Sequence, residues 1–223
     1  MQWITNYDLF LFDLDGLLVN TEELHYQAYK EMLRRRGYAL PWNLIRYYQA
    51  AHMGSGNIAE HLYREFPALK KIDWAVLYGE KRAILTDALQ KDALQLMPGV
   101  EPLLNTLSVN KIGCCVVTHS RAEDVALIRK KLSVLNTIPH WLTREDYEHP
   151  KPHPAGYQKA MELFLKPGGR VVGFEDTHRG LMALVAAGVS QPVLICDPEH
   201  PQMEQPVSER VRHFASFDVV DLH

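Results

Sequence analysis

Four short apolar runs alternate with helical stretches along the chain, and this alternation constrains the fold more than any other feature. The runs occupy residues 8–12, 112–117, 171–174 and 192–196. Each run is short and is bounded by turn-forming residues, so we interpret each one as a strand that is buried on both faces. Strands that alternate with helices are typical of a parallel sheet flanked by helices. The sequence therefore predicts an α/β fold.

A long segment with a mostly helical pattern separates the first two predicted strands. Residues 13–111 are far more than one crossover connection between parallel strands requires. Thr21 is a candidate N-cap for a first helix, and a second long helix is predicted to begin near Asp73. We therefore predict an all-helical insertion after the first strand, which spans residues 20–95.

The composition is that of an ordinary globular protein, and it disfavours several classes of partner. The formal net charge is −3 at pH 7, which argues against general binding to nucleic acid. No apolar run approaches the roughly 18 residues of a membrane helix, and the N-terminus lacks a signal-peptide pattern. Cys114, Cys115 and Cys196 have no metal-type spacing and are typical of small buried residues. We expect a cytoplasmic protein, a monomer or alternatively a dimer, with no nucleic-acid or membrane partner.

Acidic, hydroxyl and lysine side chains occur at or near the ends of the predicted strands. They are Asp13, Asp15, Thr118, Lys151, Glu175 and Asp176. Because the carboxyl ends of parallel strands meet at one edge of a sheet, where ligands bind in α/β folds, we expect these groups to gather there. Two carboxylates ~4 Å apart repel by about 4 kcal/mol at an effective dielectric of 20, so a divalent cation is a natural partner for such a cluster.

Four sequence strings match the motifs of one enzyme superfamily, in the same order and at similar separations. They are DLDGLLVNTE, VVTHS, KPHP and GFEDTHRG. Over nearly its whole length the chain resembles the haloacid dehalogenase (HAD) superfamily of hydrolases, in the helical-cap branch of β-phosphoglucomutase and phosphoglycolate phosphatase. The resemblance implies a Rossmann-like core formed by residues 1–19 and 96–223, with a helical cap at residues 20–95.

The resemblance implies a role for each of the acidic residues. Asp13 matches the nucleophile that attacks phosphorus and forms an aspartyl phosphate. Asp15 matches the general acid and base, and its main-chain carbonyl matches a metal ligand. Asp13 and Asp176 match the side-chain ligands of Mg²⁺, while Glu175 would bind the metal through water or orient its ligands. The expected cofactor is therefore Mg²⁺.

The resemblance also implies which residues hold the phosphoryl group. Thr118 matches the residue whose hydroxyl and neighbouring amide bind this group, and Lys151 matches the cation that offsets its charge. Pro150 and Pro152 flank Lys151 and restrict its backbone. His119 stands beside Thr118 and is either a further donor to the phosphate or an ordinary histidine.

The predicted cap carries the groups expected to contact the leaving part of the substrate. His25 falls one turn into the first predicted cap helix, where relatives have a residue that faces the active site, and Glu22 is another candidate for substrate contact. The loop at residues 52–57 contains Gly54, which permits a close approach of backbone to ligand, and Asn57. We predict substrate contacts for these four residues. For the loop, an ordinary turn between helices is the alternative.

The predicted function is Mg²⁺-dependent hydrolysis of a small phosphorylated metabolite, such as a sugar phosphate. β-Phosphoglucomutase is similar in its first motif, including Thr21 and His25. That enzyme has a lysine and an arginine that bind a second phosphate, and this chain has Met53 and Asn57 at the corresponding positions. Because this difference disfavours mutase activity, a hexose-phosphate mutase is the alternative to the phosphatase. A phosphate-binding regulatory protein without turnover is a third hypothesis.

Overall fold

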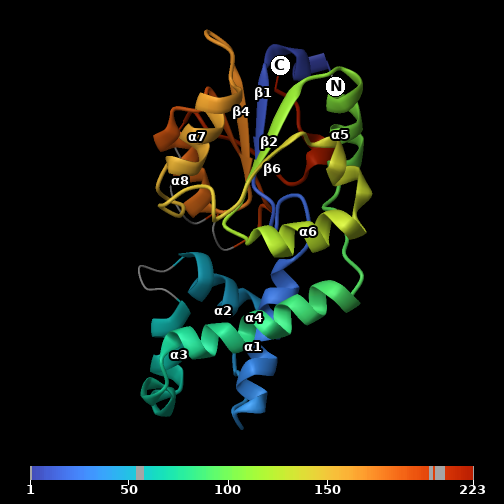
Figure 1. The fold of residues 1–223 in the computed structure, drawn as a ribbon. Coiled ribbons are helices and arrows are strands. Elements are labelled where there is room, and N and C mark those ends of the chain that lie inside the picture. Colours follow the sequence, from blue (N-terminus) through green and yellow to red (C-terminus); the bar gives the residue numbers. More distant parts are fainter. Residues whose placement is uncertain (1, 54–57, 201–202, 204–208, 223) are drawn as a thin grey trace. The chain divides into compact units, whose positions relative to one another are not determined.

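The computed structural model describes residues 2–53, 58–200, 203 and 209–222 (Figure 1). The chain divides into two compact units. The core unit consists of Met1–Asn20 and Leu94–His223, and the helical unit consists of Thr21–Ala93. None of the described helices has both the length and the apolar character needed to cross a membrane.

A parallel sheet forms the centre of the core unit. In the described residues its strand order is β3-β2-β1-β4-β5-β6, and every neighbouring pair is parallel. The strands are β1 (Leu9–Phe12), β2 (Gly113–Val117), β3 (His140–Leu142), β4 (Val171–Glu175), β5 (Gln191–Ile195) and β6 (Arg212–Phe214). Because β1 lies between β2 and β4, the residues that follow these three strands are brought together at one edge.

The four predicted strands correspond to β1, β2, β4 and β5, whereas β3 and β6 were not predicted. Both missed strands have three residues and lie at the edges of the sheet. An edge strand pairs on one side and can leave its side chains partly exposed, so it needs no continuous apolar run. The sequences His-Trp-Leu and Arg-His-Phe therefore carry little strand signal.

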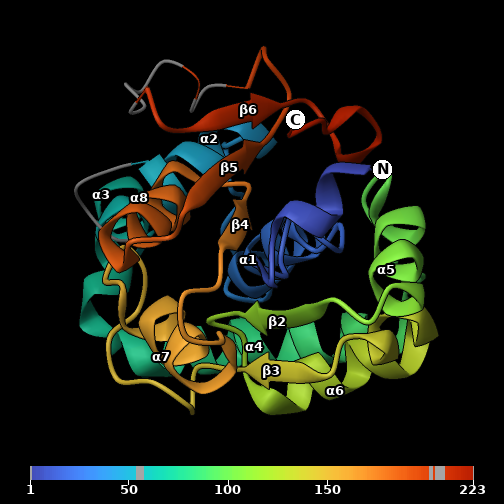
Figure 2. The ribbon, with the colours of Figure 1, turned by 90° about the horizontal axis from the view of Figure 1, so that it is seen from above.

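Helices cover both faces of this sheet. They are α5 (Val100–Val109), α6 (Ala122–Lys131), α7 (Ala155–Phe164) and α8 (His178–Ala187), with short 3-10 turns η1 (Gln2–Asn6), η4 (Ser133–Thr137) and η6 (Phe217–Val219). Figure 2 shows α7 and α8 on one face and α5 on the other. Successive residues of β1 point to opposite faces. Leu9 and Leu11 join the cluster that contains α7 and α8, while Phe10 and Phe12 stack on Phe174.

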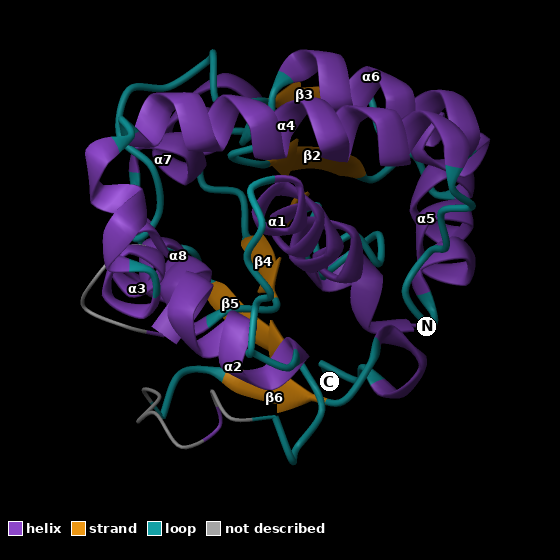
Figure 3. Cartoon of the chain, turned by 90° about the horizontal axis from the view of Figure 1, so that it is seen from below, coloured by secondary structure: helices purple, strands orange, loops and turns teal. Residues whose placement is uncertain are grey.

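The helical unit is built around the pair α1 and α4, seen from below in Figure 3. Its elements are α1 (Glu22–Arg35), α2 (Leu44–Tyr48), the π-helical turn η2 (Gln49–Met53), α3 (Ile58–Glu65), the 3-10 turn η3 (Pro67–Lys71) and α4 (Trp74–Lys91). The helix α4 begins next to Asp73 as expected, and the side chain of Asp73 caps it by accepting from the N–H of Ala75 at 2.7 Å. Thr21 occupies the N-cap position of α1 as predicted, and its carbonyl accepts from the N–H of His25 at 3.1 Å, but its side chain makes no capping hydrogen bond.

Candidate active site

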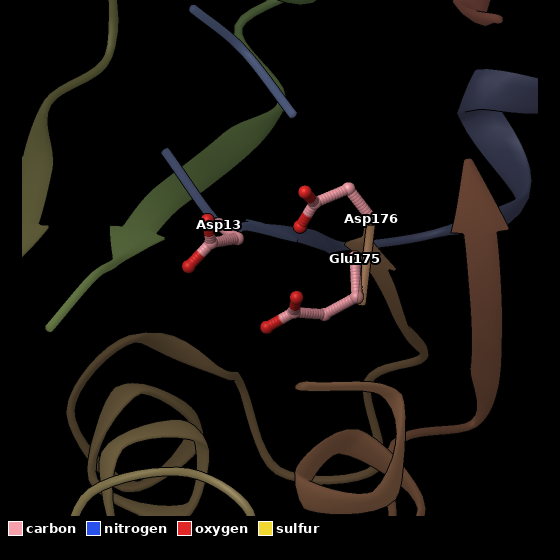
Figure 4. Close-up of side chains that lie close together, drawn as sticks. All are labelled: Asp13, Glu175 and Asp176. Carbon is pink, nitrogen blue, oxygen red and sulfur yellow. The ribbon is translucent and has the colours of Figure 1, made fainter. Parts of the chain in front are cut away.

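Three carboxylates converge where β1 and β4 end. Asp13 follows β1, and its N–H donates to the carbonyl of Phe174 at 3.2 Å, which holds it beside the end of β4. Glu175 is the last residue of β4, and Asp176 follows it. One oxygen from each of the three carboxylates lies within 4.8 Å of the other two (Figure 4). All three residues are buried. The neighbouring positions of β1 and β4 in the sheet thus produce the cluster.

Lys151 binds two of these three carboxylates. Its Nζ donates to Asp13 Oδ1 and lies 2.6 Å from Glu175 Oε1. It also donates to the main-chain oxygen of Val117, the last residue of β2, at 2.9 Å. The guanidinium of Arg179 donates through Nε to the carbonyl of Lys151. The lysine is therefore fixed at both its backbone and its ammonium group.

Burial and neighbouring charges together shift the pKa values of Asp13 and Lys151. Burial raises the pKa of Asp13 to about 7; the ammonium of Lys151 lowers this pKa, while Glu175 and Asp15 raise it further. Burial alone would lower the pKa of Lys151, but the carboxylates of Asp13 and Glu175 outweigh it and raise that pKa well above its usual value. Lys151 is thus held charged, and burial and the neighbouring acids disfavour ionisation of Asp13.

The donor set fits a divalent cation. The cluster of Asp13, Glu175 and Asp176 offers oxygen ligands, which hard cations such as Mg²⁺ prefer. Three carboxylates and one lysine leave excess negative charge among these four groups when all are ionised, and a cation would offset it. The side chain of Asp15 is not part of this cluster. The atom of Asp15 predicted to bind metal is its main-chain carbonyl oxygen, and that role stays a prediction.

The side chain of Asp15 instead contacts the loop that follows β2. Its Oδ2 accepts a hydrogen bond from Ser120 Oγ at 2.6 Å and another from Thr118 Oγ1 at 3.3 Å. The structure therefore brings Asp15 and Thr118 together as expected. The sequence motifs assign no role to Ser120. Its one signal in the sequence is its place two residues after Thr118, at a strand end.

The same loop carries His119, which was predicted to contact substrate. Partial burial, together with the positive charges of Arg144, Arg179 and Lys151, lowers the pKa of His119 to about 4. Its ring is therefore neutral near pH 7. The hydroxyl of Tyr147 donates to the carbonyl of Thr118 at 2.8 Å and holds the loop in place.

Two residues that the sequence did not single out fix the position of Glu175. Tyr157, on α7, is 1% exposed; its hydroxyl donates to Glu175 Oε1, and its ring lies 4.9 Å from the ammonium of Lys151. Gly180, on α8, leaves room for this carboxylate, since a Cβ there would lie 2.0 Å from it. Tyr157 and Gly180 thus help to hold the carboxylate of Glu175 within the cluster.

In the helical unit, two of the predicted substrate-binding residues make close polar contacts. Glu22 Oε2 lies 3.1 Å from His52 Nε2, and His25 Nδ1 lies 3.1 Å from Lys81 Nζ. Burial raises the pKa of Glu22, but His52, His25 and Lys81 outweigh this effect and lower it to about 2. The predicted contacts Gly54 and Asn57 lie outside the described residues.

Lys81 was missed although it had a signal in the sequence. It is 2% exposed, and it stands four residues from both Leu77 and Leu85 on the buried face of α4. A lysine within an apolar stripe is rarely buried unless its charge is compensated. The helix pattern alone could have identified it as an unusual residue.

A family model decides the classification of the chain. The model, for haloacid dehalogenase-like hydrolases, matches residues 7–188. The chain belongs to the haloacid dehalogenase-like hydrolases. This HAD hydrolase is 31% identical over 199 residues to the probable pseudouridine-5'-phosphatase of Drosophila melanogaster, with 86% of this chain and 83% of that protein covered. It is 28% identical over 213 residues to (DL)-glycerol-3-phosphatase 2 of Arabidopsis thaliana, with 90% and 84% covered.

Solved structures confirm the fold of this HAD hydrolase. CbbY from Rhodobacter sphaeroides, in complex with phosphate, aligns with a TM-score of 0.75 at 21% identity and 96% coverage of each chain. A HAD hydrolase of family IA, variant 3, from Entamoeba histolytica aligns with a TM-score of 0.76 at 23% identity and the same coverage. The predicted Rossmann-like α/β fold with its helical content is therefore confirmed. The family model confirms the predicted superfamily.

Proposed function

We propose that this HAD hydrolase is a phosphatase that cleaves the phosphomonoester of a small phosphorylated metabolite. The observation that carries the proposal is the buried cluster of Asp13, Glu175 and Asp176, with Lys151 bonded to Asp13. The names of the two curated relatives support it, since both are phosphatases of small phosphorylated alcohols or nucleosides.

In the proposed reaction, Asp13 is the nucleophile and Asp15 is the general acid and base. A carboxylate oxygen of Asp13 forms a bond to phosphorus while the bond from phosphorus to the alcohol oxygen breaks, and Asp15 donates a proton to that oxygen. Asp15 then takes a proton from water as the water oxygen bonds to phosphorus. The bond between Asp13 and phosphorus breaks, so that phosphate leaves and both residues are regenerated.

The proposed cofactor is Mg²⁺. Its ligands would be the carboxylates of Asp13 and Asp176 and the main-chain carbonyl of Asp15, with Glu175 binding through water or orienting the other ligands. When bound, the ion supplies positive charge that stabilises the phosphoryl oxygens. The convergence of three buried carboxylates within 4.8 Å supports this assignment.

The phosphoryl group itself would be held by the loop after β2 and by Lys151. The hydroxyl of Thr118 and the neighbouring amide would bind its oxygens, and the ammonium of Lys151 would offset their charge. His119 would act as a neutral ring, because its pKa is lowered to about 4. Positioning and electrostatic stabilisation, which phosphoryl transfer requires, would thus come mainly from these residues.

The helical unit is proposed to act as the cap predicted for residues 20–95. Glu22, His25, Gly54 and Asn57 would contact the leaving part of the substrate and exclude water. The low pKa of Glu22 supports this role for one of the four, since an ionised carboxylate can accept hydrogen bonds from substrate hydroxyls. A cytoplasmic location and a monomeric state remain part of the proposal.

Hydrolysis of p-nitrophenyl phosphate with Mg²⁺, and again after addition of EDTA, tests the proposal. We expect metal-dependent release of p-nitrophenol, and the absence of release at any Mg²⁺ concentration would contradict the phosphatase activity. A screen over pseudouridine 5′-phosphate, glycerol 3-phosphate and hexitol phosphates then addresses the substrate. Conversion of β-glucose 1-phosphate into glucose 6-phosphate would favour the mutase instead.

A further inference from the structure

Ser120 makes a short hydrogen bond to the side chain that is proposed as the general acid and base. Its Oγ donates to Asp15 Oδ2 at 2.6 Å, whereas Thr118 Oγ1 reaches the same oxygen at 3.3 Å. Distances of about 2.5–2.7 Å are typical of a hydroxyl bonded to a carboxylate. Of these two hydroxyl partners of Asp15, Ser120 is therefore the closer and the better suited to fix its direction.

The backbone of Ser120 is itself held on both sides. Its N–H donates to Thr118 Oγ1 at 3.0 Å, and its carbonyl accepts from the N–H of Arg144 at 3.2 Å. The N–H of Thr118 donates in turn to the carbonyl of Leu142, the last residue of β3, at 2.9 Å. The loop after β2 is thus tied to the end of β3. These backbone hydrogen bonds therefore fix the position from which the hydroxyl of Ser120 reaches Asp15.

The side chain of Asp15 does not belong to the cluster of three carboxylates. It is partly exposed, it is not among the groups that could share a cation, and it is bonded to the loop proposed to hold the phosphoryl group. A general acid must lie within hydrogen-bond reach of the oxygen that it protonates, so its direction matters as much as its chemistry. Ser120, which donates to Asp15 Oδ2, is not one of the three acids of the carboxylate cluster.

We propose that Ser120 is a positioning residue whose hydroxyl aims the carboxylate of Asp15 at the leaving oxygen of the phosphomonoester. This inference rests on the proposed function and deepens it. The proton still passes from Asp15 to the leaving oxygen as the bond from phosphorus to that oxygen breaks. Ser120 transfers no proton to the substrate and acts through Asp15.

Two aryl phosphates that differ in their leaving groups test this role with Mg²⁺ present. p-Nitrophenolate leaves without a proton, whereas the more basic phenoxide of phenyl phosphate benefits from a general acid. Because kcat/KM reports the loss of transition-state stabilisation relative to free enzyme and substrate, we expect Ser120→Ala to lower it about tenfold to a hundredfold for phenyl phosphate. For p-nitrophenyl phosphate the loss should stay below about threefold.

The variants Ser120→Thr and Ser108→Ala complete the experiment. Ser120→Thr keeps a hydroxyl and should restore kcat/KM for phenyl phosphate to within about threefold of the wild type. Ser108 is exposed on α5, outside the site, and Ser108→Ala should leave both substrates unaffected. Thermal melting of each variant reports whether the fold is intact.

The possible outcomes separate this inference from the proposed function. Suppose that the wild type cleaves both esters. An equal loss of kcat/KM for the two esters in Ser120→Ala would mean that Ser120 binds the phosphoryl group or supports the fold. No loss for either ester would mean that its hydroxyl does not contribute to the reaction. Either result overturns the positioning role and leaves the phosphatase proposal standing. If the wild type cleaves neither ester, the proposed function fails and this inference fails with it.

Discussion

The Nζ of Lys151 lies 2.6 Å from Glu175 Oε1 while it also donates to Asp13. One ammonium group therefore joins the proposed nucleophile to an acid that is 1% exposed. In a buried cluster, removal of a lysine leaves the carboxylates that it contacted without its charge and without a hydrogen-bond donor. We therefore expect both the stability of the fold and the proposed chemistry to depend on this lysine.

Lys151→Met should destabilise the protein in the absence of divalent ions. Loss of one partner from a buried ion pair typically costs about 3–5 kcal/mol of unfolding free energy, because the remaining charge is uncompensated. Added Mg²⁺ should restore part of this loss. Urea denaturation with and without Mg²⁺ measures both effects, with Lys166→Met at an exposed lysine as the control. Equal stability of the two variants would contradict the charge balance described for the site.

Asp13→Asn should abolish turnover and leave the fold intact. Asparagine keeps an oxygen that can accept from Lys151, but it is a poor nucleophile. We expect the rate of p-nitrophenyl phosphate hydrolysis to fall by at least about a thousandfold. Residual activity above that level, with a thermal melting curve like that of the wild type, would mean that another group attacks phosphorus.

Mg²⁺ should raise the melting temperature of the wild type, and less so that of Asp176→Asn. Ligand at about a hundred times its dissociation constant stabilises the folded state by about 2.7 kcal/mol. For a chain of this size this corresponds to a shift of roughly 5–10 °C. Scanning calorimetry over a Mg²⁺ titration measures the shift, with Glu162→Gln on α7 as an exposed control. A shift that Asp176→Asn retains in full would remove Asp176 from the ligand set.

The strands that were predicted and the two that were missed differ in one physical respect. β1, β2, β4 and β5 lie inside the sheet, so they must be apolar on both faces and appear as continuous apolar runs. β3 and β6 close its two edges, where partial exposure relaxes that demand. Each of these strands pairs with a strand that is distant in the sequence, and a local sequence pattern does not reveal such a pairing.

The site shows the same division between local and distant information. Asp13 and Asp176 could be found because each follows a strong strand signal. Ser120 and Tyr157 contact residues that lie 105 and 18 positions away, Asp15 and Glu175, and neither stands out by its residue type. Only the folded chain identifies such partners.

The unfolding free energy should fall with pH below about 4.5, partly through Glu22. The pKa of its carboxyl is 4.5 in its ordinary state and about 2 in the folded protein, so ionised Glu22 stabilises the fold above pH 4.5 and this contribution is lost as the pH falls toward 2. At about 1.4 kcal/mol per pKa unit, the full loss approaches about 3 kcal/mol. The partners that oppose protonation are His52, His25 and Lys81.

Urea denaturation between pH 5.5 and 3 checks this dependence in Glu22→Gln and Glu23→Gln. Glu23 is the neighbouring acid, bonded to Gln27 in an exposed pair, so its replacement should leave the pH dependence like that of the wild type. In Glu22→Gln the unfolding free energy should depend less on pH than in the wild type. Parallel curves for the wild type and Glu22→Gln would show that the pair with His52 adds no stability.

A methyl group at Gly180 should disturb Glu175, whereas the same change at Gly79 should not disturb its surroundings. A Cβ at Gly180 would lie 2.0 Å from the carboxylate of Glu175, which Tyr157 and Lys151 hold in place, and overpacking of this kind costs about 1–3 kcal/mol. Gly79 lies within α4 with nothing within 4 Å of such a Cβ, so Gly79→Ala should stabilise the protein by about 0.5–1 kcal/mol. Urea denaturation should therefore show opposite signs for the two variants, and calorimetric titration should show weaker Mg²⁺ binding in Gly180→Ala alone. Gly180→Ala with the stability and the Mg²⁺ affinity of the wild type would contradict this prediction. Such a result would mean that the carboxylate of Glu175 does not pack against α8 and does not contribute to Mg²⁺ binding from that position.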